Sequence, residues 1–266
     1  MLLRKACLLS VVVLFGCDGV DVEATGLDAN AEIVANLRIA GYPESEIEVV
    51  AGEVIVGGDA VVSLEASREM IGVADGHDHE HEDGPQFRQY RTSNLIAPSI
   101  AVICVDGSAY TGTLSQALDA AIANYTNLSL SFDMKRTSGS TAGCDAVIKA
   151  TSKGAAGGSA GFPEGGLPYD NINIGKSTTS YGLAVTTHVV THELGHCIGF
   201  RHTDFYNRTI SCGTGGNEGD GGVGAIHIAG TPTTAVLDGS VMNSCFNNGS
   251  TGKWTASDLT ALNAVY

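Results

Sequence analysis

Three histidines and one glutamate stand at fixed offsets in the string HELGHCIGFRH, which covers residues 192–202. His192 and His196 are four residues apart, so on a helix their imidazoles lie on one face and can bind one metal ion. Gly199 can adopt the left-handed backbone conformation that ends a helix, which brings up His202 as a third ligand. Three neutral imidazoles leave a fourth position open, as is typical of catalytic zinc. The string therefore predicts one catalytic Zn²⁺.

Glu193 directly follows the first histidine and can face the same cavity without binding the metal. We predict that it is the catalytic general base, which takes a proton from water. Gly195 keeps the helix slim where a substrate or another strand passes. His188 lies one turn before His192 on the same face, but about 12 Å of helix axis separates it from His196. A polar or supporting role for His188 is therefore expected rather than metal binding.

The same string fits the HExxHxxGxxH pattern of the metzincins, a clan of zinc peptidases, and SVMN at residues 240–243 resembles their Met-turn. The Met-turn lies beneath the metal, which would place Met242 there. Residues 224–233, the string SVMNSC and the ending DLTALNAVY extend the resemblance. Over roughly Tyr90 to Tyr266 the chain resembles the bacterial dual-action HEIGH metallopeptidase family.

This resemblance implies an α+β fold with a mixed twisted β-sheet, an active-site helix and a small irregular C-terminal subdomain that carries the Met-turn. It also implies zinc-dependent hydrolysis of peptide bonds. The chain departs from the neighbouring astacins, which have tyrosine two residues after the Met-turn methionine and glutamate after the third histidine. Here these positions hold Ser244 and Thr203, so no tyrosine ligand is expected.

A glycine-rich stretch, GGSAGFP at residues 157–163, is ordinary loop composition. In metzincins an edge strand in this region lies above the zinc and pairs with an extended substrate. By that resemblance the candidate substrate strand consists of Ser159, Ala160, Gly161 and Phe162.

The string VGGDA at residues 56–60 loosely resembles a motif of astacin propeptides, in which an aspartate takes the open zinc position. Asp59 is therefore a candidate for keeping the enzyme latent, because a carboxylate is a good zinc ligand. Gly-Gly-Asp is also ordinary turn chemistry, and a plain β-turn is the preferred alternative.

The first residues have the pattern of a secretory signal: Arg4 and Lys5 precede an apolar run that is too short to span a bilayer. The run ends in LFGC, which resembles a bacterial lipobox, and we favour lipidation of Cys17 over ordinary cleavage. The expected location is outside the cytoplasm, either as a bacterial membrane-anchored lipoprotein or as a secreted protein.

We expect the chain to consist of three regions. Residues 1–17 are the signal peptide, residues 18–89 are a pro-region or N-terminal appendage, and residues 90–266 are the catalytic domain. The appendage ends in the acidic, histidine-rich string HDHEHEDG at residues 77–84. Its histidines could hold a metal loosely, but the string has no apolar residue to pack, which favours a solvated linker.

The chain has seven cysteines, two of them within residues 1–17. The remaining five are an odd number in a compartment that permits disulfides, so at most two bridges can form. We expect Cys104–Cys144 and Cys212–Cys245, which leaves Cys197 on the buried back of the metal-binding helix. The sequence alone leaves the other pairings open.

The chain carries 29 acidic against 14 basic residues, a formal net charge of −15 at pH 7. Binding to phosphate backbones needs a basic surface, so this balance argues against a nucleic-acid partner. It favours solubility outside the cell. We expect a peptide or protein substrate, membrane contact only through a lipid anchor, and a monomer.

Apolar residues at helical spacing predict helices over 30–39, 113–125, 184–198 and 255–265. Short apolar or alternating runs predict strands at 100–105, 128–132, 146–148 and 172–174, and two more between 49 and 64. Residues 203–239 are expected to be mostly coil.

The preferred function is a zinc metalloendopeptidase that cleaves extracellular or periplasmic proteins. One alternative keeps the fold and changes the substrate to a cell-wall peptide or a propeptide. The other is a non-catalytic surface lipoprotein whose metal only holds its fold. Glu193 separates the two classes, because a structural site has no need of an acid beside an open position.

Overall fold

The computed structural model describes residues 22–74, 89–219, 224–232 and 234–266. Its helices are α1 (Val22–Ile39), α2 (Leu64–Ala74), α3 (Gly112–Thr126), α4 (Leu183–Cys197), α5 (Thr209–Cys212) and α6 (Ala256–Val265), with 3₁₀ turns η1 (Glu44–Glu46) and η2 (Lys176–Tyr181). Its strands are β1 (Ile47–Val50), β2 (Glu53–Val56), β3 (Ala60–Val62), β4 (Tyr90–Arg91), β5 (Val102–Asp106), β6 (Asp133–Thr137), β7 (Ala146–Thr151), β8 (Gly158–Gly161), β9 (Asn171–Ile174), β10 (Phe200–Arg201) and β11 (Ile226–His227).

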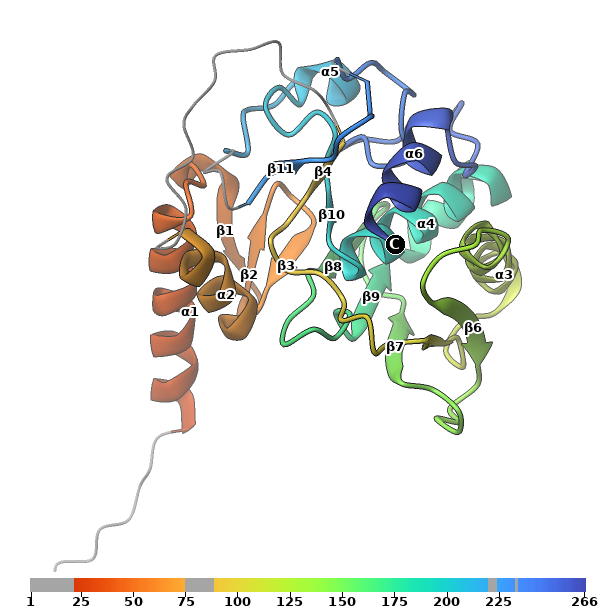
Figure 1. Ribbon diagram of the computed structural model, residues 1–266, viewed down its shortest axis with the longest axis horizontal. Helices are drawn as coiled ribbons and strands as arrows, with labels where there is room; N and C mark the ends of the chain where they lie inside the picture. Colours follow the sequence, from red (N-terminus) through yellow and green to blue (C-terminus); the bar gives the residue numbers. More distant parts are fainter. Residues whose placement is uncertain (1–21, 75–88, 220–223, 233) are drawn as a thin grey trace, which may run out of the picture.

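The main sheet has eight strands in the order β1-β2-β3-β8-β9-β7-β5-β6. The pairs β5–β6, β5–β7, β7–β9 and β3–β8 are parallel, and the others are antiparallel. Helices α3 and α4 pack against each other, and α4 also contacts β8 and β9 (Figure 1). The expected α+β fold with a mixed sheet is therefore confirmed.

Apolar residues form two separate cores. The larger core fills the space between the sheet and α3 and α4, where Ile103, Leu118, Ile172 and Leu194 are completely buried. The smaller core joins α1, α2 and the strands β2 and β3 of the N-terminal region. It contains one residue from the rest of the chain, Phe162, which follows β8. The N-terminal region thus has a core of its own and is docked onto the main part through Phe162 and the sheet.

One contact between the two parts is a parallel strand pair. In this pair Ala60 of β3 lies opposite Ala160 of β8, and the Ala160 amide donates to the Asp59 carbonyl over 3.2 Å. Gly161 lets β3 come close, because a Cβ there would lie 2.6 Å from the Val61 carbonyl oxygen and the Tyr169 ring. A strand, β8, does form at the expected place, but it covers Gly158–Gly161 and Phe162 follows it. Because β3 and β9 pair with its two sides, it is not an edge strand in this structure.

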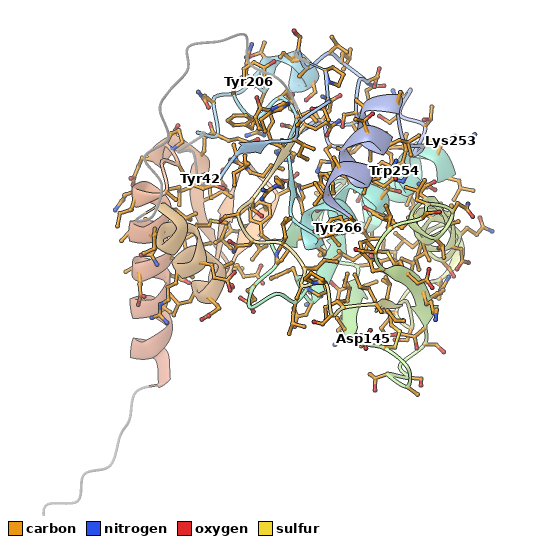
Figure 2. All side chains as sticks on the ribbon, viewed as in Figure 1. Tyr42, Asp145, Tyr206, Lys253, Trp254 and Tyr266 are labelled. Atoms are coloured by element: carbon orange, nitrogen blue, oxygen red, sulfur yellow. A yellow bond between two sulfur atoms is a disulfide. The ribbon has the colours of Figure 1, made fainter. Side chains whose placement is uncertain are left out.

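The remaining chain forms a small, mostly irregular part with the three-stranded sheet β10-β4-β11 and the helices α5 and α6. Trp254 and Tyr266 flank α6 and pack against the larger core (Figure 2). The expected disulfides are confirmed: Cys104 is bonded to Cys144 and Cys212 to Cys245. Cys197 is a buried free thiol, as expected.

Several expected elements need correction. Residues 128–132 are not a strand, since β6 begins at Asp133. The alternation there arises in a connecting segment, where Leu128 and Leu130 pack on the core from outside the sheet. The helix α2 was not predicted, although Ala66 and Met70, four residues apart, are completely buried. The strand β1 was also missed, because its Val49 and Val50 are exposed and break the expected alternation.

Residues 1–17, Cys17 and the histidine-rich string at 77–84 lie outside the described residues. Among the helices that the structure describes, none is long and apolar enough to cross a membrane.

Candidate metal centre

Helix α4 and the turn that ends it bring the three histidines of the sequence motif together. His192 and His196 project from one face of α4, which ends at Cys197. Gly199 has a φ of 101°, and the chain then enters β10 and reaches His202. A Cβ on Gly199 would lie 2.7 Å from the carbonyl oxygen of Asn94. Glycine is therefore required there both for the backbone turn and for the close contact.

Each histidine donates a hydrogen bond from Nδ1 to an oxygen. His192 donates to the Val241 carbonyl over 2.8 Å and His196 to the Phe200 carbonyl over 2.7 Å. His202 reaches the Glu218 carboxylate over 2.6 Å. With a metal bound, these bonds would keep the proton on Nδ1, so that each Nε2 could present a lone pair. All three lone pairs point at one place.

The Nε2 atoms are separated by distances that suit tetrahedral zinc. The distance is 3.0 Å between His192 and His196, 3.2 Å between His192 and His202, and 3.3 Å between His196 and His202. Zinc–nitrogen bonds of about 2.0–2.1 Å put tetrahedral ligands about 3.3–3.4 Å apart. With their protons on Nδ1, the Nε2 lone pairs repel one another unless a cation lies between them. The residues therefore fit one zinc ion.

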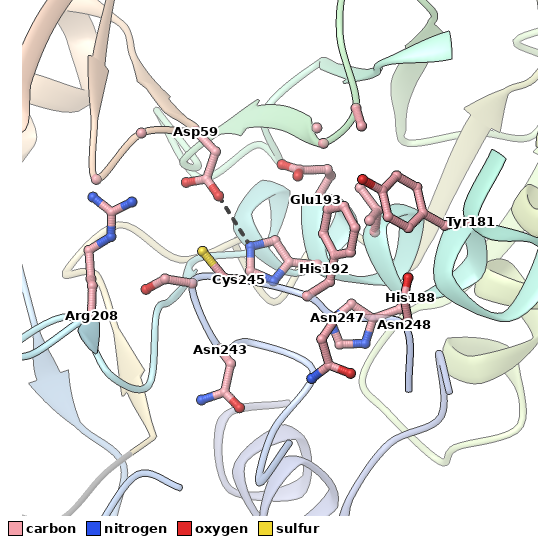
Figure 3. Close-up of a pocket in the computed structure, with 18 residues that line it drawn as sticks. Asp59, Tyr181, His188, His192, Glu193, Arg208, Asn243, Cys245, Asn247 and Asn248 are labelled. Carbon is pink, nitrogen blue, oxygen red and sulfur yellow. Dashed lines mark ion pairs between the residues drawn. The ribbon is translucent and has the colours of Figure 1, made fainter. Parts of the chain in front are cut away.

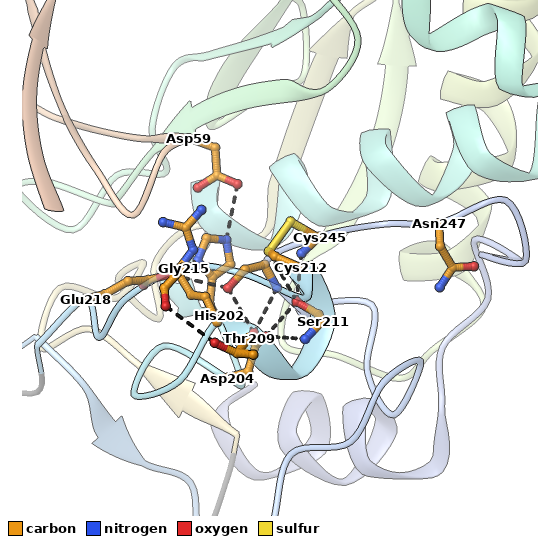
Figure 4. The surroundings of a disulfide bond; sticks show 12 residues. Asp59, His202, Asp204, Thr209, Ser211, Cys212, Gly215, Glu218, Cys245 and Asn247 are labelled. Carbon is orange, nitrogen blue, oxygen red and sulfur yellow. Dashed lines mark hydrogen bonds and ion pairs between the residues drawn. A yellow bond between two sulfur atoms is a disulfide. The ribbon is translucent and has the colours of Figure 1, made fainter.

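Asp59 supplies the fourth corner of this tetrahedron. Its Oδ2 lies 3.2 Å from Nε2 of His202 and 3.5 Å from Nε2 of His192 (Figures 3 and 4). Asp59 is held in a turn between β2 and β3, in which Gly57 and Gly58 have φ values of 63° and 91°. The two interpretations of VGGDA are thus compatible, because the tight turn is what carries the carboxylate to the histidines.

His188 lies apart from this group. The four residues whose candidate ligand atoms lie within 4.8 Å of one another are Asp59, His192, His196 and His202. The His188 ring is 6.5 Å from that of His192, centroid to centroid. Burial, with the nearby His192, lowers the pKa of His188 to about 3, so it stays neutral at ordinary pH.

Glu193 faces the same cavity from α4. It is buried, and its Oε2 has no hydrogen-bond partner in the part of the chain that the structure describes. The first residue of β8 is Gly158, where a Cβ would overlap the Glu193 carboxylate. Burial, and then the nearby Asp59, raise the pKa of Glu193 well above its usual range. The absence of a side chain at Gly158 thus leaves room for the Glu193 carboxyl group, whose raised pKa favours the protonated form.

The turn at residues 240–243 contacts α4 and the chain that follows it. A Cβ on Gly195 would lie 2.6 Å from the sulfur of Met242, so the gap in the helix is filled by this methionine. The expectation that a substrate or strand passes Gly195 is therefore wrong. The Thr203 amide donates to the Met242 carbonyl over 2.8 Å. The Val241 amide donates to Asp258 of α6 over 3.0 Å, which anchors the turn.

Sequence reasoning missed Glu218, which holds the third histidine. Its second oxygen receives a hydrogen bond from Arg201 over 3.1 Å, and both side chains are almost fully buried. The Arg201 guanidinium also lies 4.8 Å above the Tyr42 ring. Burial opposes the charged form of Glu218, but His202 and Arg201 outweigh it and lower the pKa. In the sequence, Glu218 is one acidic residue in a glycine-rich stretch, and nothing there distinguishes it from a solvent-exposed acid.

A cavity of about 540 Å³ opens beside the histidines (Figure 3). Its wall includes Asp59, Tyr181, His188, His192, Glu193, Arg208, residues 156–158 and residues 243–248. The cavity thus borders Glu193 and His192, next to Asp59.

This fold, with its triad of histidines and a buried glutamate at an open cavity, is that of a zinc metallopeptidase. The profile of the dual-action HEIGH metallo-peptidase family matches residues 54–266, and the chain belongs to that family. The match begins well before Tyr90, so it includes β3 and Asp59.

Solved structures resemble the chain at low identity. Myroilysin has a TM-score of 0.40 at 14% identity, over 66% of this chain and 98% of that one. High choriolytic enzyme 1, a hatching enzyme zinc-protease from the medaka fish Oryzias latipes, has a TM-score of 0.38 at 14% identity, over 66% and 94%. A search of the curated proteins found no match.

The geometry predicts which histidines hold the metal. His196→Ala removes one corner of the tetrahedron, so the dialysed protein should retain far less than one zinc ion per chain. His188→Ala, one turn from His192 on the same helix, should retain its zinc and serves as the control. Elemental analysis of both variants makes the comparison. Equal zinc loss in the two variants would contradict the assignment.

Proposed function

We propose that the chain is a zinc endopeptidase in which Glu193 is the general base and His192, His196 and His202 hold the metal. The observation that supports this most is the free oxygen of Glu193, buried beside three converging lone pairs. A structural zinc site has no use for such a carboxylate. The proposed substrates are peptides or proteins outside the cytoplasm.

A zinc ion held by His192, His196 and His202 would polarise a water molecule and the scissile carbonyl group. Glu193 accepts the proton of the attacking water at Oε2 and later donates it to the leaving amine. The Nδ1 hydrogen bonds hold the imidazoles in place throughout, and Met242 supports His196 and its neighbours by filling the space at Gly195.

The substrate strand is proposed to be β8, with Ser159, Ala160 and Gly161, followed by Phe162. This strand begins at Gly158, against the Glu193 carboxylate, so a peptide paired with it would pass the base. In the full chain β3 uses the hydrogen-bonding side of β8 that such a peptide needs. Access to β8 therefore requires β3 to leave.

The N-terminal segment, residues 18–89, is proposed to keep the enzyme latent. It blocks the cleft in two ways: β3 pairs with β8, and Asp59 takes the fourth corner of the metal site. Residues 90–266 are the proposed catalytic domain, and the linker before Tyr90 is the proposed place of the activating cut. The larger core and both disulfides belong entirely to residues 90–266.

A second candidate function is a non-catalytic metal-binding protein. The observation in its favour is that Asp59 closes the tetrahedron, because closed four-ligand sites are typical of structural zinc. In that case the N-terminal segment would be a permanent part of the fold. The two candidates differ in whether loss of Asp59 creates activity.

The role of Glu193 can be tested directly. Glu193→Gln leaves the three histidines intact, so zinc content should not change. Loss of the base should lower peptide hydrolysis about 10²–10⁴-fold. The proteins are assayed after the linker has been cut. Asp133→Asn, an exposed change in β6 of the proposed catalytic domain, is the control and should behave as the wild type. Turnover and zinc are measured on the same preparations, and undiminished turnover of the Glu193 variant would disprove the mechanism.

The role of Asp59 can be tested in the uncut protein. Asp59→Ala opens the fourth corner while β3 stays paired with β8. The full-length variant should therefore hydrolyse a peptide too short to need pairing with β8, which the uncut wild type leaves intact. Glu48→Ala, elsewhere in the same segment, should stay silent. If the Asp59 variant is as slow as the uncut wild type, and a chain cut in the linker is no faster, the latency proposal is wrong.

Export and anchoring at Cys17 are proposed from the signal-like residues 1–17, and the anchored form is proposed to be a monomer. If Cys17 is acylated, Cys17→Ala should abolish incorporation of labelled fatty acid and release the protein from the membrane fraction. Unchanged partitioning of that variant would favour simple secretion.

A further inference from the structure

Arg208 is the only lysine or arginine among the described residues that line the cavity. It stands at the start of α5, six residues after His202. Figure 3 shows its guanidinium on the same side of the cavity as Asp59, across from Tyr181. The guanidinium is partly buried, with 21% of the side chain exposed. A partly buried cation at a substrate cavity calls for an anionic partner.

In the full chain that partner is Glu46 from the N-terminal segment. Nη1 of Arg208 donates to the Glu46 carboxylate over 3.0 Å, and only 10% of the Glu46 side chain is exposed. The carboxylate also lies against Gly216, where a Cβ would overlap it. Residues of the catalytic domain thus form a notch, Arg208 on one side and Gly216 on the other, that is shaped around a carboxylate.

No other acid in the described structure takes the place of Glu46. The two oxygens of Glu218 already accept from His202 over 2.6 Å and from Arg201 over 3.1 Å. Arg208 is farther away, with its Nε 3.7 Å from Glu218, and this Nε has no hydrogen-bond partner among the described residues. While Glu46 is present, the positive charges of Arg201 and Arg208 are balanced by the negative charges of Glu46 and Glu218. Its removal leaves Arg208 with one unmatched positive charge.

We infer that Arg208 is a carboxylate-binding subsite, which Glu46 fills in the full chain and an aspartate or glutamate side chain of the substrate fills in the active enzyme. The inference rests on the proposed function, peptide hydrolysis after the N-terminal segment leaves. A guanidinium suits this role because its planar donors match the geometry of a carboxylate. The N-terminal segment then imitates an acidic substrate at this position while Asp59 covers the metal.

The test uses the zinc-loaded full chain, folded first and then cut at a protease site placed within residues 76–84. The N-terminal fragment is separated before assay. Substrates are pairs of peptides that differ only by glutamate or glutamine, with the varied residue moved through the positions on both sides of the cleaved bond. The value of kcat/KM is compared within each pair, which cancels effects common to both peptides.

At one position the glutamate peptide should be favoured about tenfold at low salt, as expected for a charge-assisted hydrogen bond at a partly exposed site. Arg208→Gln should abolish the preference, and Arg208→Glu should replace it with a preference for lysine. Lys135→Gln is the matched control: it removes the same charge from an exposed site on β6, at the opposite edge of the sheet. That variant should keep the wild-type preference.

Peptide affinity measured on the cut Glu193→Gln protein gives a second readout that needs no turnover. The same tenfold difference in Kd between the glutamate and glutamine peptides should appear, and Arg208→Gln should remove it. Equal affinity and equal kcat/KM within every pair, or a preference that survives Arg208→Gln, would overturn the inference. Failure of the cut wild type to hydrolyse any peptide would instead contradict the proposed function.

Discussion

The convergence of three imidazole Nε2 atoms within 3.0–3.3 Å is the constraint on which the rest of the structure depends. For the Nε2 atoms to approach one another, each Nδ1 must donate its hydrogen bond to an acceptor outside the metal site. The three acceptors come from three separate parts of the chain. They are the carbonyl of Val241, the carbonyl of Phe200 and the carboxylate of Glu218. Three segments therefore belong to the metal centre although they contribute no ligand. They are the turn at residues 240–243, the strand β10 and the loop at residues 213–219.

In the proposed function, the N-terminal segment occupies the positions that a substrate would take. It adds a strand to β8, puts one carboxylate on the metal site and puts a second carboxylate on Arg208. These three contacts come from η1, β3 and the turn before β3, which one small core holds together. The family match begins at residue 54 and so includes Asp59 and β3. The family profile thus covers part of the N-terminal segment for which we propose a role in latency.

The features predicted correctly from the sequence were those with local causes. The four-residue spacing of His192 and His196, and the glycine at 199, determine the helix, its end and the return of the chain within eleven residues. Contacts between residues far apart in the sequence produce no local sequence pattern, so they were not predicted. Glu218 has no periodic neighbours, and the pairing of β3 with β8 joins residues about a hundred positions apart. The false strand at 128–132 has a similar cause, because its alternation reflects packing of a loop on the core rather than pairing in a sheet.

Zinc K-edge X-ray absorption on the zinc-loaded full chain tests the central claim most directly, because it counts and identifies the ligands. The structure predicts one four-coordinate site with three imidazole nitrogens and one oxygen, at about 2.0–2.1 Å. A spectrum with sulfur in the coordination sphere, or with fewer than three imidazoles, would contradict the centre described above.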